Sequence, residues 1–185
     1  WCDRLAALPR RLDAGGWHNA FIDVNGQLLT SGPDEEYPGL LGHGPGVTRL
    51  AVPTPVPSLM GTRVHSVSAA AYHTLVLTEA GRVLSFGEGA FGRLGHGDTE
   101  DQHTPKVIEA LRGQRVVAVE AGLSHSLVLT EAGAVLSFGC GVDGRLGHGD
   151  IEDGDIEDGD IEDGDIEDLQ LTPKVIEALR GQRVV

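Results

Sequence analysis

The sequence predicts an all-β fold, a partial and open β-propeller with four-stranded blades. The first observation behind this prediction is a long internal repeat. A block that starts at His73 returns almost unchanged at His125, 52 residues later, and a weaker copy starts at His18. The second observation is that short apolar runs alternate with glycine-rich turns inside each copy, which is typical of strands joined by tight connections. Units of this length with three or four strands are typical of propeller blades.

The repeat divides the chain into a short N-terminal lead-in and one repeat domain with about three and a half units. We place the lead-in at residues 1–12, the domain at 13–185, and the units at about 26–80, 81–132 and 133–185. The offset between the first two units is 53 to 55 residues instead of 52, so the first unit contains short insertions.

The second unit illustrates the strands that we expect. His73–Thr78 and Arg82–Phe86 are expected to pair as a hairpin, because the short loop Glu79-Ala80-Gly81 separates two apolar runs. Val116–Val119 is expected to form the next strand, which ends at Ala121-Gly122. These runs are short and rich in branched residues, as strands are.

Residues Thr104–Gly113 carry two conflicting patterns. A Thr, a Pro at the next position and a closing Gly together favour a short helix. The same place in a propeller blade belongs to an outer strand, and we therefore predict an edge strand over Pro105–Ile108.

The third unit contains an acidic low-complexity stretch, residues 150–168, with eight Asp, four Glu and no Lys or Arg. Its Ile residues recur every five positions, which is neither a helical nor a strand period. A calcium loop starting at Asp153 would need Gly at its sixth position, where Asp158 stands, and a Glu at its twelfth, where there is none. We interpret the stretch as a solvated loop grown by tandem duplication. A partner-binding acidic segment and weak cation binding are the alternatives.

Composition excludes several classes of function. The formal net charge is −14, with 28 acidic and 14 basic residues, but outside 150–168 the chain has 16 acidic residues and is almost neutral. Without a basic face, nucleic-acid binding is disfavoured. No apolar run reaches the roughly 18 residues of a membrane span. Cys2 and Cys140 have no metal or redox spacing, so we expect an intracellular location, in the cytoplasm or nucleus.

Two motifs suggest chemistry that the repeat explains better. Gly87–Gly92 and Gly139–Gly144 match the glycine pattern of dinucleotide sites, but a turn-rich Arg-Leu-Gly-His-Gly-Asp follows each, where a helix would be needed. Five of the eight histidines occupy repeat positions, so blade symmetry would hold equivalent histidines far apart. We expect these histidines to hydrogen-bond turn backbone. The sequence therefore nominates no catalytic residue, no metal ligand, no cofactor and no specific binding residue. The positions that define the repeat are Gly87, Leu94, Gly95, Gly97, Gly122, His125, Gly139, Leu146, Gly147 and Gly149.

These motifs resemble the repeats of the regulator of chromosome condensation family. The matching segments are Gly81–Gly87, Leu94–Asp98, Pro105–Ile108, Gly113–Val119 and Ala121–His125. The resemblance implies a propeller of that type, in which seven blades close a ring. Seven units would need about 360 residues, so we expect this chain to be a fragment. Its open edges would need the remaining blades, a partner or self-association to cover them.

The resemblance also implies the candidate functions. We expect a non-enzymatic propeller module that binds a protein partner. The first alternative is guanine-nucleotide exchange on a small Ran-like GTPase, and the second is an accessory propeller of a HECT-type ubiquitin ligase. Fold alone does not decide among them.

Overall fold

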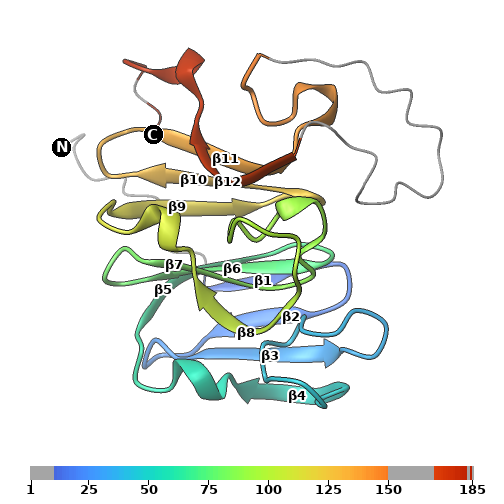
Figure 1. Cartoon of the computed structure of the whole chain (residues 1–185). Coiled ribbons are helices and arrows are strands. Elements are labelled where there is room, and N and C mark those ends of the chain that lie inside the picture. Colours follow the sequence, from blue (N-terminus) through green and yellow to red (C-terminus); the bar gives the residue numbers. More distant parts are fainter. Residues whose placement is uncertain (1–10, 150–168, 183, 185) are drawn as a thin grey trace.

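Figure 1 shows the computed structural model, which describes residues 11–149, 169–182 and 184 as three four-stranded antiparallel sheets. Blade 1 consists of β1 (Leu12–Ala14), β2 (Asn19–Ile22), β3 (Leu28–Pro33) and β4 (Arg49–Pro55). Blade 2 consists of β5 (Val64–Ala69), β6 (His73–Thr78), β7 (Val83–Gly87) and β8 (Gln102–Val107). Blade 3 consists of β9 (Val116–Ala121), β10 (His125–Thr130), β11 (Val135–Cys140) and β12 (Leu169–Val175).

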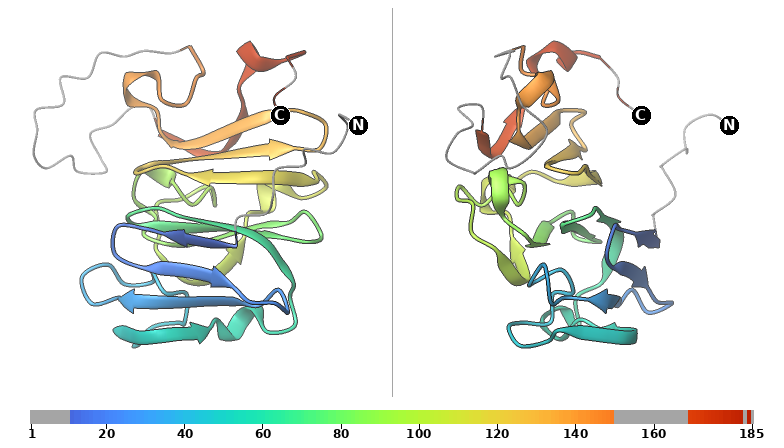
Figure 2. Two further views of the ribbon diagram at one scale, coloured as in Figure 1. Left: turned by 180° about the vertical axis from the view of Figure 1, so that it is seen from behind. Right: turned by 90° about the vertical axis from the view of Figure 1, so that its right-hand side faces the viewer.

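The three blades stack side by side and do not close into a ring (Figures 1 and 2). In every blade the strands follow chain order, so each sheet is a simple meander. The first strands β1, β5 and β9 contact one another along the inner side of the stack. The all-β class, the four-stranded blades and the open arrangement predicted from the sequence are thus confirmed.

The segment with both helical and strand patterns forms the outer strand of blade 2 and the turn after it. β8 contains Pro105, as predicted, and pairs with β7 on one side only, so no ladder hydrogen bond is lost on its free edge. Immediately after it comes a single turn of 3-10 helix, η3 (Glu109–Leu111). The helical pattern therefore reflects this turn. The other short helices are η1 (Pro57–Leu59), η2 (Ala90–Gly92), η4 (Val142–Gly144) and η5 (Glu177–Leu179).

The repeat units of the sequence and the blades of the structure are out of phase. The unit that we place at about 26–80 contains β3 and β4 of blade 1 followed by β5 and β6 of blade 2. The next unit, at about 81–132, joins blades 2 and 3 in the same way. One sequence unit thus links two neighbouring blades through the chain itself.

Two hydrophobic cores lie between the blades rather than within any one of them. The first joins Ala20, Ile22 and Leu28 of blade 1 to Val76 and Phe86 of blade 2. The second core, between blades 2 and 3, is made by Leu75, Leu77, Val83, Ile108, Leu111, Val116, Val119, Val128, Leu136 and Phe138. Blade 2 contributes apolar side chains to both cores, so packing against the neighbouring blades stabilises it.

The longer connections gather at one end of the sheets, on the right-hand side of Figure 1. They are the β3–β4, β7–β8 and β11–β12 connections, and the β1–β2, β5–β6 and β9–β10 turns lie at the same end. We call this end the loop face. The acidic stretch 150–168 lies outside the described residues, and its interpretation stays a prediction.

Candidate protein-binding surface

One set of repeat histidines links neighbouring blades. His18 Nε2 lies 2.6 Å from Thr74 Oγ1, and His73 Nε2 lies 2.8 Å from Ser126 Oγ. Both contacts are buried and join residues more than 50 positions apart. His125 begins β10, at the position equivalent to His73. His18 and His73 therefore join neighbouring blades.

The second set lies in the Leu-Gly-His-Gly turns. Each histidine bonds a hydroxyl on the third strand of its own blade, and that hydroxyl donates a 2.7 Å hydrogen bond to the carbonyl of the turn leucine. The expected bond from histidine to turn backbone is thus replaced by a histidine–hydroxyl–backbone chain. The pairs, with their nitrogen–oxygen distances, are His43–Thr30 at 3.1 Å, His96–Ser85 at 3.0 Å and His148–Ser137 at 2.9 Å.

Burial keeps the interblade histidines neutral. Desolvation lowers the pKa of His18 to about 4. It lowers the pKa of His73 to about 3, and the nearby positive charge of Arg93 adds to the effect. In the described part of the chain, Nδ1 of both rings is buried without a hydrogen-bond partner. A second proton would therefore be placed where nothing accepts it.

The repeat glycines allow close approach both within a blade and at a blade junction. Gly139 has φ of +115°, and a Cβ there would lie 2.5 Å from the carbonyl oxygen of Ser124. Gly95 has φ of +77°, and a Cβ there would lie 2.8 Å from the Phe138 ring of the next blade. Leu94 and Leu146 are buried beside these turns. Gly87 ends β7 with φ of +108°, at the position equivalent to Gly139. The remaining repeat glycines lie in connections between strands: Gly97, Gly122, Gly147 and Gly149.

The loop face carries a row of aromatic rings that the repeat does not require. Trp17 and Tyr37 have ring centroids 5.7 Å apart, and Tyr37 and Tyr72 have centroids 4.8 Å apart with planes tilted by 60°. The guanidinium carbon of Arg93 lies 5.4 Å from the Tyr72 centroid and 5.3 Å from that of Phe91. We call these five residues the aromatic row. Distances below about 6 Å are those of cation–π contacts.

Local sequence positions each member of the row. Trp17 and Tyr72 directly precede the interblade histidines of their blades, and the equivalent residue of blade 3 is Ser124. Tyr37 lies in the β3–β4 connection, which is two residues longer than its equivalent in blade 2 between the strand glycine and the turn leucine. Phe91 lies in η2 with φ of +61°, and its ring contacts the Arg93 guanidinium.

Arg93 anchors the row. Its side chain is 3% exposed and pairs with Glu88 at 3.0 Å, and its Nε donates to the Ala90 carbonyl at 2.8 Å. Its own carbonyl accepts a 2.8 Å hydrogen bond from Ser126 Oγ of blade 3. A buried and hydrogen-bonded guanidinium of this kind is a rigid platform for the rings above it.

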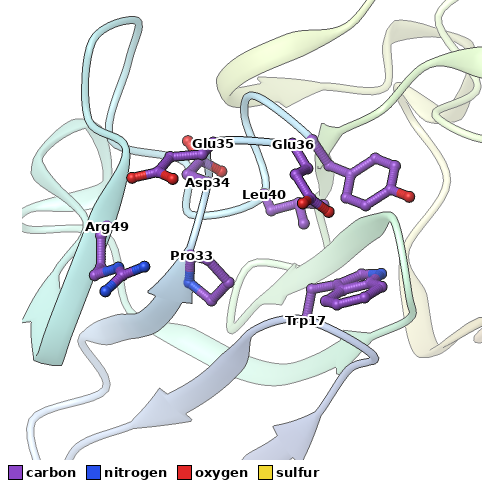
Figure 3. Close-up of a pocket in the computed structure, with 8 residues that line it drawn as sticks. Trp17, Pro33, Asp34, Glu35, Glu36, Leu40 and Arg49 are labelled. Carbon is purple, nitrogen blue, oxygen red and sulfur yellow. The ribbon is translucent and has the colours of Figure 1, made fainter.

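A shallow hollow of about 150 Å³ adjoins the row (Figure 3). Its lining includes Trp17, Tyr37, Glu36 and Arg49. Asp34 fixes the loop beneath, because its carboxylate accepts hydrogen bonds from the backbone of Gly39 and Leu41, both at 3.1 Å. Burial raises the pKa of Asp34. The surface thus combines one exposed ring and three partly buried rings with flanking charges on a firm backbone.

The described residues contain no group of three or more His, Cys, Asp or Glu side chains arranged to hold a metal ion. Among the same residues, no helix has the length and apolar character needed to cross a membrane. Cys140 is a buried free thiol. Sequence reasoning missed the aromatic row. Its trace in the sequence is that the residue before the interblade histidine varies, as Trp17, Tyr72 and Ser124, where the surrounding motif repeats.

The stacked meander sheets and their interblade histidines define a β-propeller repeat protein. Profiles of the regulator of chromosome condensation (RCC1) repeat match residues 25–77, 80–129 and 132–185. The chain belongs to this RCC1 repeat family, as its motifs predicted. A second profile of the same repeat matches residues 64–93 and 116–145.

The relatives include proteins of very different kinds. The chain is 38% identical over 187 residues to the human E3 ubiquitin-protein ligase HERC2, covering 100% of this chain and 4% of HERC2. It is 36% identical to the Ultraviolet-B receptor UVR8 of Arabidopsis thaliana, covering 98% of this chain and 38% of UVR8. The structure resembles Prp20p of Saccharomyces cerevisiae with a TM-score of 0.71 at 19% identity, covering 92% of this chain and 38% of Prp20p. The chain thus spans well under half the length of these relatives.

Proposed function

We propose that this chain is a non-enzymatic interaction module that binds a protein partner through its loop face. The observation that carries this proposal is the aromatic row, whose outermost ring, Trp17, is 45% exposed on a surface with no structural need for it. Aromatic and arginine side chains at the centre of a surface are typical of protein-binding hot spots. The rigid Arg93 platform would lower the entropy lost on binding.

The relatives support an accessory role within this proposal. The similarity to HERC2 extends over the whole chain but over a small part of that ligase. A module of this size would then recruit a partner for activity located elsewhere in a larger protein, as in the HECT-type alternative. The free thiol of Cys140 is compatible with the reducing intracellular location that we propose.

Guanine-nucleotide exchange is the second candidate. The structural relative Prp20p has binding properties toward Gsp1p and histones. At 19% identity this likeness concerns the fold alone. Exchange needs a wedge that displaces nucleotide, and no side chain of the described loop face corresponds to one that we can name.

The interaction proposal is tested by partner capture with matched variants. Trp17→Ala removes an exposed ring and Tyr37→Ala a partly buried one, whereas Val24→Ala and Met60→Ala remove exposed apolar side chains from the β2–β3 and β4–β5 connections at the opposite end. We expect a partner whose retention falls at least tenfold with the first pair and is unchanged with the second, and calorimetry with the purified partner should reproduce this difference. Binding that both pairs leave unchanged would place the interface elsewhere.

Release of a fluorescent guanine nucleotide from a panel of small GTPases separates the two candidates. We expect no acceleration by this chain or by a longer protein that contains it. Acceleration that Trp17→Ala abolishes and Val24→Ala preserves would instead make exchange the function of the loop face.

A further inference from the structure

One end of the aromatic row shows how the loop face holds a positive charge. The guanidinium carbon of Arg93 lies 5.4 Å from the Tyr72 centroid and 5.3 Å from that of Phe91. The same guanidinium pairs with a carboxylate oxygen of Glu88 at 3.0 Å. Two rings and one carboxylate therefore surround the cation, and its burial strengthens the attraction between the charge and the rings.

The other end of the row has rings and a carboxylate of the same kind. The ring centroids of Trp17 and Tyr37 lie 5.7 Å apart with planes tilted by 34°, and Glu36 lines the hollow beside them. Among the described residues, no Lys or Arg makes a cation–π contact with either ring. Within the same part of the chain, Glu36 forms no ion pair. These groups are therefore available to a cation from another molecule.

Acidic side chains predominate around the hollow. The β3–β4 connection begins with three consecutive acidic residues, Asp34, Glu35 and Glu36, all of which line it. In the described structure the lining contains one basic residue, Arg49. Figure 3 shows the Glu36 carboxylate directed toward the Trp17 ring, with Arg49 on the other side of the hollow. The aromatic side of the hollow is thus its negatively charged side.

This negative charge acts on the rings themselves. Interaction with Tyr72 raises the pKa of Tyr37, and the negative charges of two carboxylates, those of Glu36 and Glu88, raise it further. Groups that disfavour a second negative charge favour a positive one at the same place. We infer that the hollow receives a lysine or arginine side chain of the protein partner, with its cation against the rings and paired with Glu36. This inference rests on the proposed function, because it specifies the partner's chemistry at the same surface.

The size and charge of the hollow argue against other occupants. Its volume of about 150 Å³ is smaller than the roughly 300 Å³ at which small-molecule pockets begin, and it suits a single side chain. An apolar side chain would cover the rings but would desolvate the Glu36 carboxylate without pairing it. An acidic side chain would be attracted to Arg49 and repelled by three carboxylates. A lysine or arginine satisfies both the rings and the carboxylates.

The indole N–H signal of Trp17 in the NMR spectrum of the whole chain tests the inference. The protein has two tryptophans, so Trp17→Ala identifies this signal, and the signal of Trp1 serves as an internal reference. The probes are the Nα-acetyl amides of lysine, arginine, norleucine and glutamate, of which norleucine has the alkyl chain of lysine without its charge. We expect lysine and arginine to shift the Trp17 signal at about fivefold lower concentration than norleucine.

Matched charge variants locate the interaction. Glu36→Gln should reduce the response to lysine to that of norleucine, whereas Glu131→Gln, in the β10–β11 connection at the opposite end, should leave it unchanged. Arg49→Gln removes a like charge and should leave lysine binding at least as tight. Signal dispersion in the same spectra establishes that each variant is folded.

Two results would overturn the inference. Equal responses to lysine and norleucine would show that the rings alone recognise the probe, and a stronger response to glutamate would make Arg49 the recognition group. Partner capture keeps this failure separate from that of the proposed function. A partner whose capture depends on Trp17, without selectivity for lysine or arginine, would support the proposed function and overturn the inference. Selectivity for lysine without such a partner would support the cation site and contradict the proposed function.

Discussion

At the scale of single residues, Gly95, His18 and His73 act at blade junctions. Gly95 and Gly113 both have positive φ, but a Cβ at Gly95 would lie against the Phe138 ring, whereas one at Gly113 would meet nothing within 4 Å. Substituting each glycine with alanine therefore separates the cost of backbone strain from the cost of a packing clash. The interblade histidines are neutral and buried, so protonating them would disturb the packing between blades.

Gly95→Ala should lower the free energy of unfolding by about 2–4 kcal/mol, because it combines a left-handed backbone with a clash at 2.8 Å. Gly113→Ala has only the backbone penalty, of about 1 kcal/mol. Urea denaturation measures both values. Equal losses would mean that the Phe138 ring moves aside freely.

Acidification should destabilise the fold through His18 and His73. Their ordinary pKa is 6.5, and burial lowers it to about 4 and about 3 in the folded state. The unfolded chain then binds more protons between these values, so stability falls as the pH drops from about 6.5 toward 3. His73→Gln, which cannot be protonated, should flatten the pH dependence of the free energy of unfolding over this range. An unchanged slope would show that carboxylates dominate it.

At the scale of elements, the β7–β8 and β11–β12 connections are two versions of one loop. In the shorter one, three residues separate Asp98 from the start of β8 at Gln102, and Asp101 accepts a 2.8 Å hydrogen bond from the Gly89 backbone. The longer contains the acidic stretch. Extra length in such a connection adds little loop-closure entropy.

Deleting residues 154–168 joins Asp153 to Leu169 and leaves one residue more between Asp150 and Thr172 than between the equivalent Asp98 and Thr104. We expect the melting temperature to change by less than about 2 °C, because loop entropy grows slowly with length. Differential scanning calorimetry checks this value. A large decrease would mean that the acidic stretch packs on the blades.

At the scale of the whole molecule, the contacts that stabilise the fold are concentrated at the junctions between blades. Both cores lie between blades, and each junction adds one histidine–hydroxyl bond. Arrays that are held by nearest-neighbour contacts lose structure locally when one junction is weakened.

Phe138→Ala removes a fully buried ring at the junction of blades 2 and 3, which should lower the free energy of unfolding by about 3–5 kcal/mol. Hydrogen exchange should then accelerate in β9–β11 more than in β2 and β3, because blade 1 keeps its own junction. Uniform acceleration across all blades would indicate a single cooperative unit.

The repeat, the all-β class and the edge strand at Pro105 could all be predicted from the amino-acid sequence. These follow from local chemistry, since period-two apolar runs, a glycine at each turn and a proline all act within a few residues. The repeat length also pointed to blades, because a lone sheet of this size leaves an apolar face exposed.

How the units meet, and which surface remains for binding, could not be predicted without the folded structure. The phase between repeat and blade depends on which strands pair, and the histidine–hydroxyl bonds join residues more than 50 positions apart. The aromatic row likewise gathers Trp17, Tyr37, Tyr72 and Phe91 from four connections. Such contacts form only when separate blades stack, because no local rule of spacing specifies which loops become neighbours.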